Sequence, residues 1–234
     1  MDLKEGIVVK TISYQDNAKI IYLITTEGKQ SLIVKGATNL KSHTFSYAQE
    51  LTKLAYNQNK MYLSAGKIIS SYVNIKKDYP TLISSLKIIE IAYELIDHIN
   101  DYQTFYKFLD EILALMNDNY NNEILELIFK VKTLYLLGVS PIFSKCVECE
   151  TRDNLVGFSF YDGGMKCQDH VLITDFIYPD KIVFPLRALY QTKLDELIPL
   201  INHFEIDYQE TDLFLNRYFE FYLGFKSRVK PIII

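Results

Sequence analysis

The residues with the clearest chemical potential lie in one short stretch, residues 145–170. This stretch, KCVECETRDNLVGFSFYDGGMKCQDH, contains all three cysteines and one of the four histidines of the 234-residue chain. Two residues separate Cys146 from Cys149, and two separate Cys167 from His170. A two-residue gap lets two neighbouring side chains turn back onto one metal ion. The spacing therefore predicts a metal site built from two ligand pairs.

Three thiolates and one imidazole form a tetrahedral donor set that suits zinc best among common ions. Because four protein groups leave no position open for water, we expect one structural zinc ion. Between the two pairs, Gly163 and Gly164 predict the turn of a short hairpin that brings the pairs together. Two alternatives stay open: the thiols could cluster by chance, and His170 could be an ordinary surface histidine near a loop.

The elements that precede this stretch are predicted to be strands at first. Five segments rich in Ile, Val, Tyr and Thr are separated by turn-like residues; they cover residues 6–14, 18–28, 30–38, 48–57 and 60–73. Five short strands with no helix between them favour a small barrel, of which the OB-fold is the common five-stranded form. We therefore expect an OB-fold β-barrel domain over residues 1–78.

From Tyr79 onward the apolar residues recur with a helical period. Helices are predicted over residues 79–100, 103–117, 122–138, 184–204 and 210–226. The predicted fold class is therefore α+β and multidomain: the barrel is followed by an all-helical domain, residues 79–234. This second domain contains the zinc-ribbon-like insert at about residues 145–172.

Charge is distributed unevenly between these two domains. Residues 1–80 contain 11 lysines, no arginine and 6 acidic residues, whereas the remaining residues carry 14 basic and 23 acidic side chains. A basic module joined to an acidic one suggests a polyanion-binding surface on the first module. The alternative is that an excess of this size is ordinary surface chemistry.

Several functional classes are disfavoured by what the sequence lacks. It contains neither a phosphate-binding glycine loop nor a hydrolase or metalloprotease motif, so we expect no enzymatic activity. No uncharged apolar run is long enough to span a membrane, and the first residues do not resemble a secretory signal. With an odd number of cysteines, these features favour a reducing cytoplasm.

Several motifs together resemble the RecO family of bacterial recombination mediators over nearly the whole chain. They are the opening strand Gly6-Ile7-Val8, residues 14–29, Lys35-Gly36-Ala37 and the segment from Gly157 to Cys167. The chain departs from the family at Thr38 and Asn39, where basic residues are typical, and at His170, where many members have cysteine.

The resemblance implies a non-enzymatic, cytoplasmic and nucleoid-associated protein with an OB-fold and a helical domain carrying a zinc-finger-like insert. Such proteins bind single- and double-stranded DNA and anneal complementary strands. The implied partners are RecR and the C-terminal tail of single-stranded DNA-binding protein, and the implied task is to help RecA load onto coated DNA. Arg217, Arg228 or Lys230 are candidates to pair with carboxylates of such a tail, and no contact with membranes is implied.

Lysine chemistry agrees with binding that ignores base sequence. An ammonium group is a compact charge suited to phosphates, whereas reading of guanine edges usually employs arginine. The predicted DNA contacts are Lys35, Lys41, Lys53, Lys60 and Lys67. Five aromatic residues could stack on bases or pack in the core instead: Tyr14, Phe45, Tyr47, Tyr56 and Tyr62. A competing interpretation is a zinc-stabilised scaffold that binds protein or RNA.

Overall fold

A computed structural model of the chain describes residues 3–175 and 179–230. Two compact units are present: the first runs to Asn122 and the second comprises Glu123–Arg228. Within the described ranges, no helix combines the length and the apolar character needed to cross a bilayer. Each unit is described separately below.

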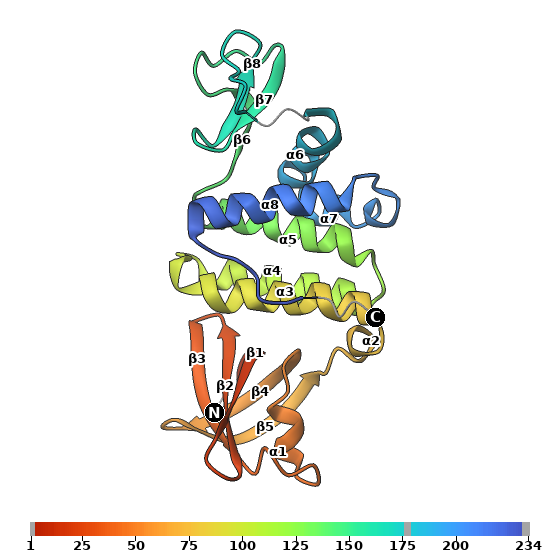
Figure 1. The fold of residues 1–234 in the computed structure, drawn as a ribbon. Coiled ribbons are helices and arrows are strands. Elements are labelled where there is room, and N and C mark those ends of the chain that lie inside the picture. Colours follow the sequence, from red (N-terminus) through yellow and green to blue (C-terminus); the bar gives the residue numbers. More distant parts are fainter. Residues whose placement is uncertain (1–2, 176–178, 231–234) are drawn as a thin grey trace. The chain divides into compact units, whose positions relative to one another are not determined.

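The first unit begins with five strands that close into a barrel (Figure 1). The strands are β1 (Lys4–Tyr14), β2 (Ala18–Thr25), β3 (Gly28–Lys35), β4 (Thr52–Asn59) and β5 (Tyr62–Ser70), in the order β1-β2-β3-β5-β4. A short helix, α1 (His43–Tyr47), lies between β3 and β4. The predicted five-stranded barrel of OB-fold type is thus confirmed, and so is the mixed α+β class.

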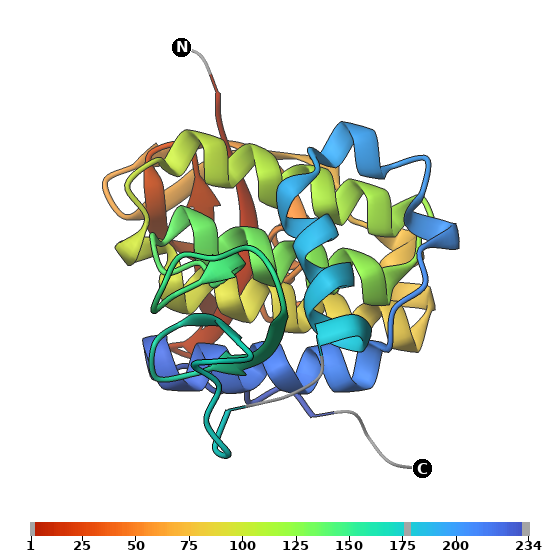
Figure 2. The same ribbon diagram turned by 90° about the horizontal axis from the view of Figure 1, so that it is seen from above.

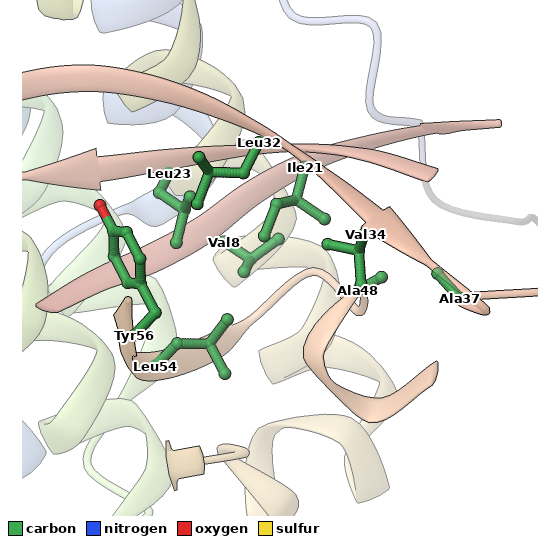
Figure 3. Close-up of a cluster of buried hydrophobic side chains, with 9 residues drawn as sticks. All are labelled: Val8, Ile21, Leu23, Leu32, Val34, Ala37, Ala48, Leu54 and Tyr56. Atoms are coloured by element: carbon green, nitrogen blue, oxygen red, sulfur yellow. The ribbon is translucent and has the colours of Figure 1, made fainter. Parts of the chain in front are cut away.

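Apolar side chains from the strands fill the barrel and fix which faces of the strands point inward (Figure 3). Val8, Ile21, Leu23 and Leu54 are fully buried there. The core residues also include Leu32, Val34, Ala37, Ala48 and Tyr56. Burial of such side chains is the main favourable contribution to the stability of the barrel.

Two long helices pack against the barrel within the same unit. After α2 (Val73–Lys77), helix α3 (Tyr79–Leu95) and the turn η1 (Ile96–His98) lead to α4 (Tyr102–Asn117). Figure 1 shows α3 and α4 at one end of the barrel, whereas α1 lies toward the opposite end. Two barrel lysines contact these helices: Lys29 pairs with Asp97 at 2.5 Å, and Lys53 pairs with Asp110 at 2.7 Å. The helices therefore use charge as well as apolar surface to hold the barrel.

The second unit is built from helices and a small sheet. Its elements are α5 (Asn122–Leu136), β6 (Ile142–Cys146), β7 (Leu155–Ser159), β8 (Gly164–Cys167), η2 (Pro179–Val183), α6 (Phe184–Gln191), α7 (Leu194–Leu197), η3 (Ile201–His203) and α8 (Tyr208–Leu223). Helices α5 and α8 lie side by side (Figure 1, Figure 2). The strands β6, β8 and β7 form a three-stranded sheet in that order.

A buried ionic network joins α5 to α8. Lys130 is almost fully buried, pairs with Glu126 at 2.7 Å and also pairs with Asp212. Burial alone would lower the pKa of Lys130, but the two carboxylates outweigh burial and raise it. Tyr208 donates a hydrogen bond to Glu126 at 2.8 Å. Because the partners come from both helices, the network links α5 to α8, and loss of the Lys130 charge would remove the cation that lies between the two carboxylates.

The structure differs from one sequence prediction in the second half of the chain. The single helix predicted over residues 184–204 is broken into α6, α7 and η3, because Thr192 is extended and ends α6. The domain boundary predicted at residue 78 stays a prediction. The compact units divide later, at Asn122, because α3 and α4 pack with the barrel.

Replacing Asp110 by alanine tests how the helices hold the barrel. Asp110 accepts hydrogen bonds from Lys53 and from the buried Tyr72 hydroxyl, at 2.7 and 3.0 Å. Without the carboxylate the Tyr72 hydroxyl loses its acceptor and Lys53 keeps only Glu5, at 3.7 Å, so the free energy of unfolding in urea should fall by about 2–3 kcal/mol. Asp97→Ala, which removes an exposed partner of Lys29, should cost less than about 1 kcal/mol. Equal losses in the two variants would contradict this account.

Candidate metal centre and nucleic-acid surface

The four predicted metal ligands come together in the second unit. Cys146 ends β6 and Cys167 ends β8, while Cys149 and His170 lie in the turns that follow these strands. The four ligand atoms all lie within 4.8 Å of one another. The Cys149 and Cys167 sulfurs are 3.7 Å apart, and the Cys167 sulfur is 3.1 Å from Nδ1 of His170. The sheet therefore brings the two ligand pairs to one point.

Backbone hydrogen bonds shape both turns in the same way. Cys146 accepts at its carbonyl oxygen from the Glu150 N–H, at 3.0 Å, and Cys167 accepts from His170 and Val171, at 3.0 and 2.9 Å. Burial would raise the pKa of the Cys146 thiol, but N–H groups of Cys149, Cys167 and Glu148 point at the sulfur and lower this pKa to about 6. Cys146 thus favours the thiolate, which is the form that binds metal.

This donor set fits zinc. Two sulfurs bound to one tetrahedral zinc ion lie about 3.8 Å apart, given a Zn–S length of about 2.3 Å, and the Cys149–Cys167 separation of 3.7 Å agrees with this. The separation of 3.1 Å between Cys167 and His170 is closer to a hydrogen bond than to a pair of zinc ligands. Small adjustment of the His170 ring would complete a four-ligand site.

The insert is anchored to α8 by aromatic side chains. The Phe158 ring lies 4.9 Å from the Phe214 ring, centroid to centroid, in an edge-to-face arrangement. The Tyr222 hydroxyl donates to the Phe160 carbonyl oxygen at 2.7 Å. Arg217 places its guanidinium 4.4 Å from the centre of the Phe160 ring. These contacts give the small sheet a packing surface that it could not build from its own residues.

The turn between β7 and β8 requires both of its glycines. Gly163 adopts a φ of +71°, which L-residues rarely adopt. Gly164 lies so close to β6 that a Cβ atom would be 2.4 Å from Val147 Cγ1 and 2.9 Å from the Ile142 carbonyl oxygen. The sequence predicted a hairpin turn at this glycine pair, and the structure has the turn between β7 and β8 there. The turn places β8 beside β6.

The five predicted DNA contacts divide into two groups. Lys53 is mostly buried and is engaged by Asp110 and by Glu5, at 2.7 and 3.7 Å. In the part of the chain that the structure describes, the other four have no carboxylate within ion-pairing distance, and all are exposed; they are Lys35, Lys41, Lys60 and Lys67. A phosphate would have to displace two carboxylates to reach Lys53, whereas the other four ammonium groups are available.

Three hydrogen bonds bring together the elements that carry most of these lysines. Gly36, next to Lys35, donates its N–H to the Asn17 carbonyl oxygen in the β1–β2 turn, at 2.6 Å. Thr38 donates its hydroxyl to the Asn17 side chain at 2.7 Å. On the other side of β3, the Ile33 N–H donates to the Met61 carbonyl oxygen at 2.8 Å, next to Lys60. The end of β3 is therefore fixed to both the β1–β2 turn and the β4–β5 turn.

Of the five aromatic candidates, Tyr56 is not available for stacking. It is fully buried in the barrel core, and burial raises its pKa to about 12. Tyr47 is half-buried and donates a hydrogen bond to the Gly66 carbonyl oxygen at 2.8 Å. Tyr14 and Phe45 are also half-buried, whereas Tyr62 is exposed. Tyr62 and Phe45 each have a lysine beside the ring.

Sequence reasoning missed two features of these surfaces. Lys19 was not among the predicted contacts, although it is the second residue of β2 and lies beside the Phe45 ring. In the insert, Lys166 is buried between Asp162 and Glu148, at 2.8 and 2.5 Å. Burial would lower its pKa, but the two carboxylates raise it to about 12. In the sequence, the only indication of this ion pair was the spacing of four residues between Asp162 and Lys166.

Comparison with known proteins covers both units. A family model described as "Recombination protein O N terminal" matches residues 1–72, and one described as "Recombination protein O C terminal" matches residues 76–230. A Bacillus cereus protein named "DNA repair protein RecO" is 28% identical over 233 residues, which cover 96% of this chain and 94% of the relative. Proteins of the same name from Bacillus cytotoxicus and Bacillus anthracis are 29% and 28% identical over the same shares.

Substitution of Gly164 by alanine tests how the sheet positions the ligands. The added methyl group would overlap Val147 and the β6 backbone, so β6 and β8 must separate. We expect the free energy of unfolding to fall by about 2–3 kcal/mol and Co²⁺ binding, followed by thiolate absorption, to weaken at least about tenfold. Gly138→Ala has free space and only a backbone cost of about 1 kcal/mol, so Co²⁺ binding should persist. Unchanged Co²⁺ affinity in Gly164→Ala would contradict this interpretation.

Proposed function

Because the chain belongs to the recombination protein O family, we propose that it binds DNA in recombinational repair and anneals complementary single strands. Its curated relatives carry the name of a DNA repair protein, which supports the repair role. The observation that carries the proposal is the set of four exposed barrel lysines without a carboxylate partner, among the described residues. In a chain of net charge −4, such a set is the part best suited to polyanions.

The mechanism follows from electrostatics. Two DNA strands repel each other through their phosphates, and ammonium groups reduce this repulsion over distances of about 8–10 Å at moderate salt. Lysine contacts the backbone and leaves the base edges unread. The strands can therefore be held close while base pairing alone decides which pair closes. The barrel would supply proximity, and the DNA would supply specificity.

The metal centre has a structural role in this proposal. Cys146, Cys149, Cys167 and His170 would hold one zinc ion, which would tie the two turns of the insert together. The donor set and the separation of 3.7 Å between two sulfurs support zinc. Since the small sheet shares its aromatic core with α8, the ion would also stabilise the surface of α8 on which the insert packs.

The second unit would provide the contacts with partner proteins. By family membership these are RecR and the C-terminal tail of single-stranded DNA-binding protein, which would lead to loading of RecA. Leu213 and Phe221 are exposed on α8, four residues before and four after Arg217. An apolar stripe with a central guanidinium suits an acidic peptide with apolar side chains.

Removal of two lysine charges tests the DNA surface. We expect four phosphate contacts to give a slope of about −2.8 for log K against log salt with single-stranded DNA, and each lost contact to reduce it by about 0.7. Lys35→Gln with Lys60→Gln should therefore lower the slope to about −1.4 and slow annealing of complementary oligonucleotides. The control is Lys4→Gln, which removes one charge that Glu27 already neutralises at 2.8 Å and should therefore change the slope by less than the value of about 0.7 expected for one lost contact. A loss of about 0.7 in the control, equal to that for each substituted lysine of the double variant, would refute the assignment to unpaired lysines.

Zinc content tests the metal proposal. Protein purified without chelator should contain about one zinc ion per chain by elemental analysis, and Cys146→Ser should lose the ion together with stability. His170→Ala should bind zinc more weakly, whereas His170→Cys should retain it because a thiolate restores the fourth donor. Metal-free protein with unchanged stability in Cys146→Ser would exclude the site.

A further inference from the structure

Two lysines of the barrel each lie beside an aromatic ring at the surface. The Lys35 ammonium is 4.7 Å from the centre of the Tyr62 ring, and the Lys19 ammonium is 5.7 Å from the centre of the Phe45 ring. Both separations are within the range of cation–π attraction. These four residues are called the lysine–aromatic pairs below.

The lysine–aromatic pairs come from different elements that the fold joins. Tyr62 lies beside Ile33, where β5 pairs with β3, two residues before Lys35. Ala18 pairs with Lys35 across β2 and β3, which places Lys19 in the next position along β2. Both pairs therefore lie near the last residues of β3, with Lys35 and Lys19 on opposite faces of the strands because Lys19 is opposite the core residue Val34. The hydrogen bonds of the two adjoining turns hold this region in place.

The rings of these pairs differ from the aromatic residues of the core. Tyr62 has 38% of its surface exposed and Phe45 is half-buried, whereas Tyr56, on the neighbouring strand, is fully buried. Exposure of a flat ring beside an ammonium group is the combination that single-strand-binding surfaces use: the ring stacks on a base and the charge meets the adjoining phosphate.

We infer that the lysine–aromatic pairs make the barrel selective for unpaired bases, so that this surface prefers single-stranded DNA to duplex. This inference rests on the proposed DNA-binding function and specifies which form of the ligand the surface selects. In a duplex the bases are stacked on one another and their faces are closed to a protein ring, so only the lysines can contribute. In a single strand both the rings and the lysines contribute. The preference is therefore assigned to the rings and the salt dependence to the lysines.

Truncation of the exposed ring separates these two contributions. Tyr62→Ala should weaken binding to a single-stranded oligonucleotide about five- to hundredfold, the effect of losing one stacked base. Binding to the matching duplex should change less than about twofold, and the salt slope should stay the same. The control is Tyr161→Ala in the second unit, which removes a tyrosine that is 86% exposed and should affect neither ligand.

A fluorescent substitution gives a second readout that does not depend on affinity. The chain contains no tryptophan, so Tyr62→Trp introduces a single probe at this position. Stacking on a base should quench its emission with single-stranded DNA and leave it nearly unchanged with duplex, whereas Tyr161→Trp should respond to neither.

The outcomes distinguish this inference from the proposed function. If the unmodified protein binds neither form of DNA, the proposed function fails. If it binds DNA but Tyr62→Ala weakens single-strand and duplex binding equally, the function stands and the inference is overturned. Quenching of the Tyr62→Trp emission by duplex as strongly as by single strands would also overturn it.

Discussion

The pairing of barrel lysines with carboxylates of the packed helices determines which lysines remain for the proposed DNA-binding surface. Lys29 and Lys53 meet Asp97 and Asp110 where the helices contact the barrel, so their charges stabilise the unit and are lost to external ligands. The exposed lysines that remain, of which Lys35 and Lys60 lie around the end of β3, keep their charges. The lysines that face the helices thus stabilise the unit, and those that do not face them are the candidates for DNA contacts.

The candidate metal site and the barrel lysines belong to different units of the chain. The four metal ligands belong to an insert whose small sheet packs on α8 through Phe158 and Phe214. Neither the ligands nor this aromatic core contains a barrel residue. Loss of a metal ion held by these ligands would therefore disturb the second unit. A functional defect in a ligand variant would point to the second unit and its partners.

Much of this arrangement was predictable because it depends on local patterns. Alternating apolar residues and turn signals identified the barrel, and the spacing of Cys146, Cys149 and Cys167 identified the insert. Contacts between distant residues were not predictable: nothing in the sequence pairs Lys53 with Asp110, and nothing separates buried Tyr56 from exposed Tyr62. The predicted helix over residues 184–204 was wrong because periodicity continues across Thr192, where the backbone turns out of the helix.

Protection of lysine ammonium groups from acetylation, measured by mass spectrometry with and without a saturating single-stranded oligonucleotide, tests the central claim most directly. Each lysine reports on its own contact with the oligonucleotide. The experiment needs no substitution, so the fold is unaltered before labelling. We expect strong protection of Lys35, Lys41, Lys60 and Lys67, with Lys4 and Lys145, a residue of the second unit, unchanged. Protection confined to the second unit, or equal labelling of every exposed lysine in both states, would contradict this claim.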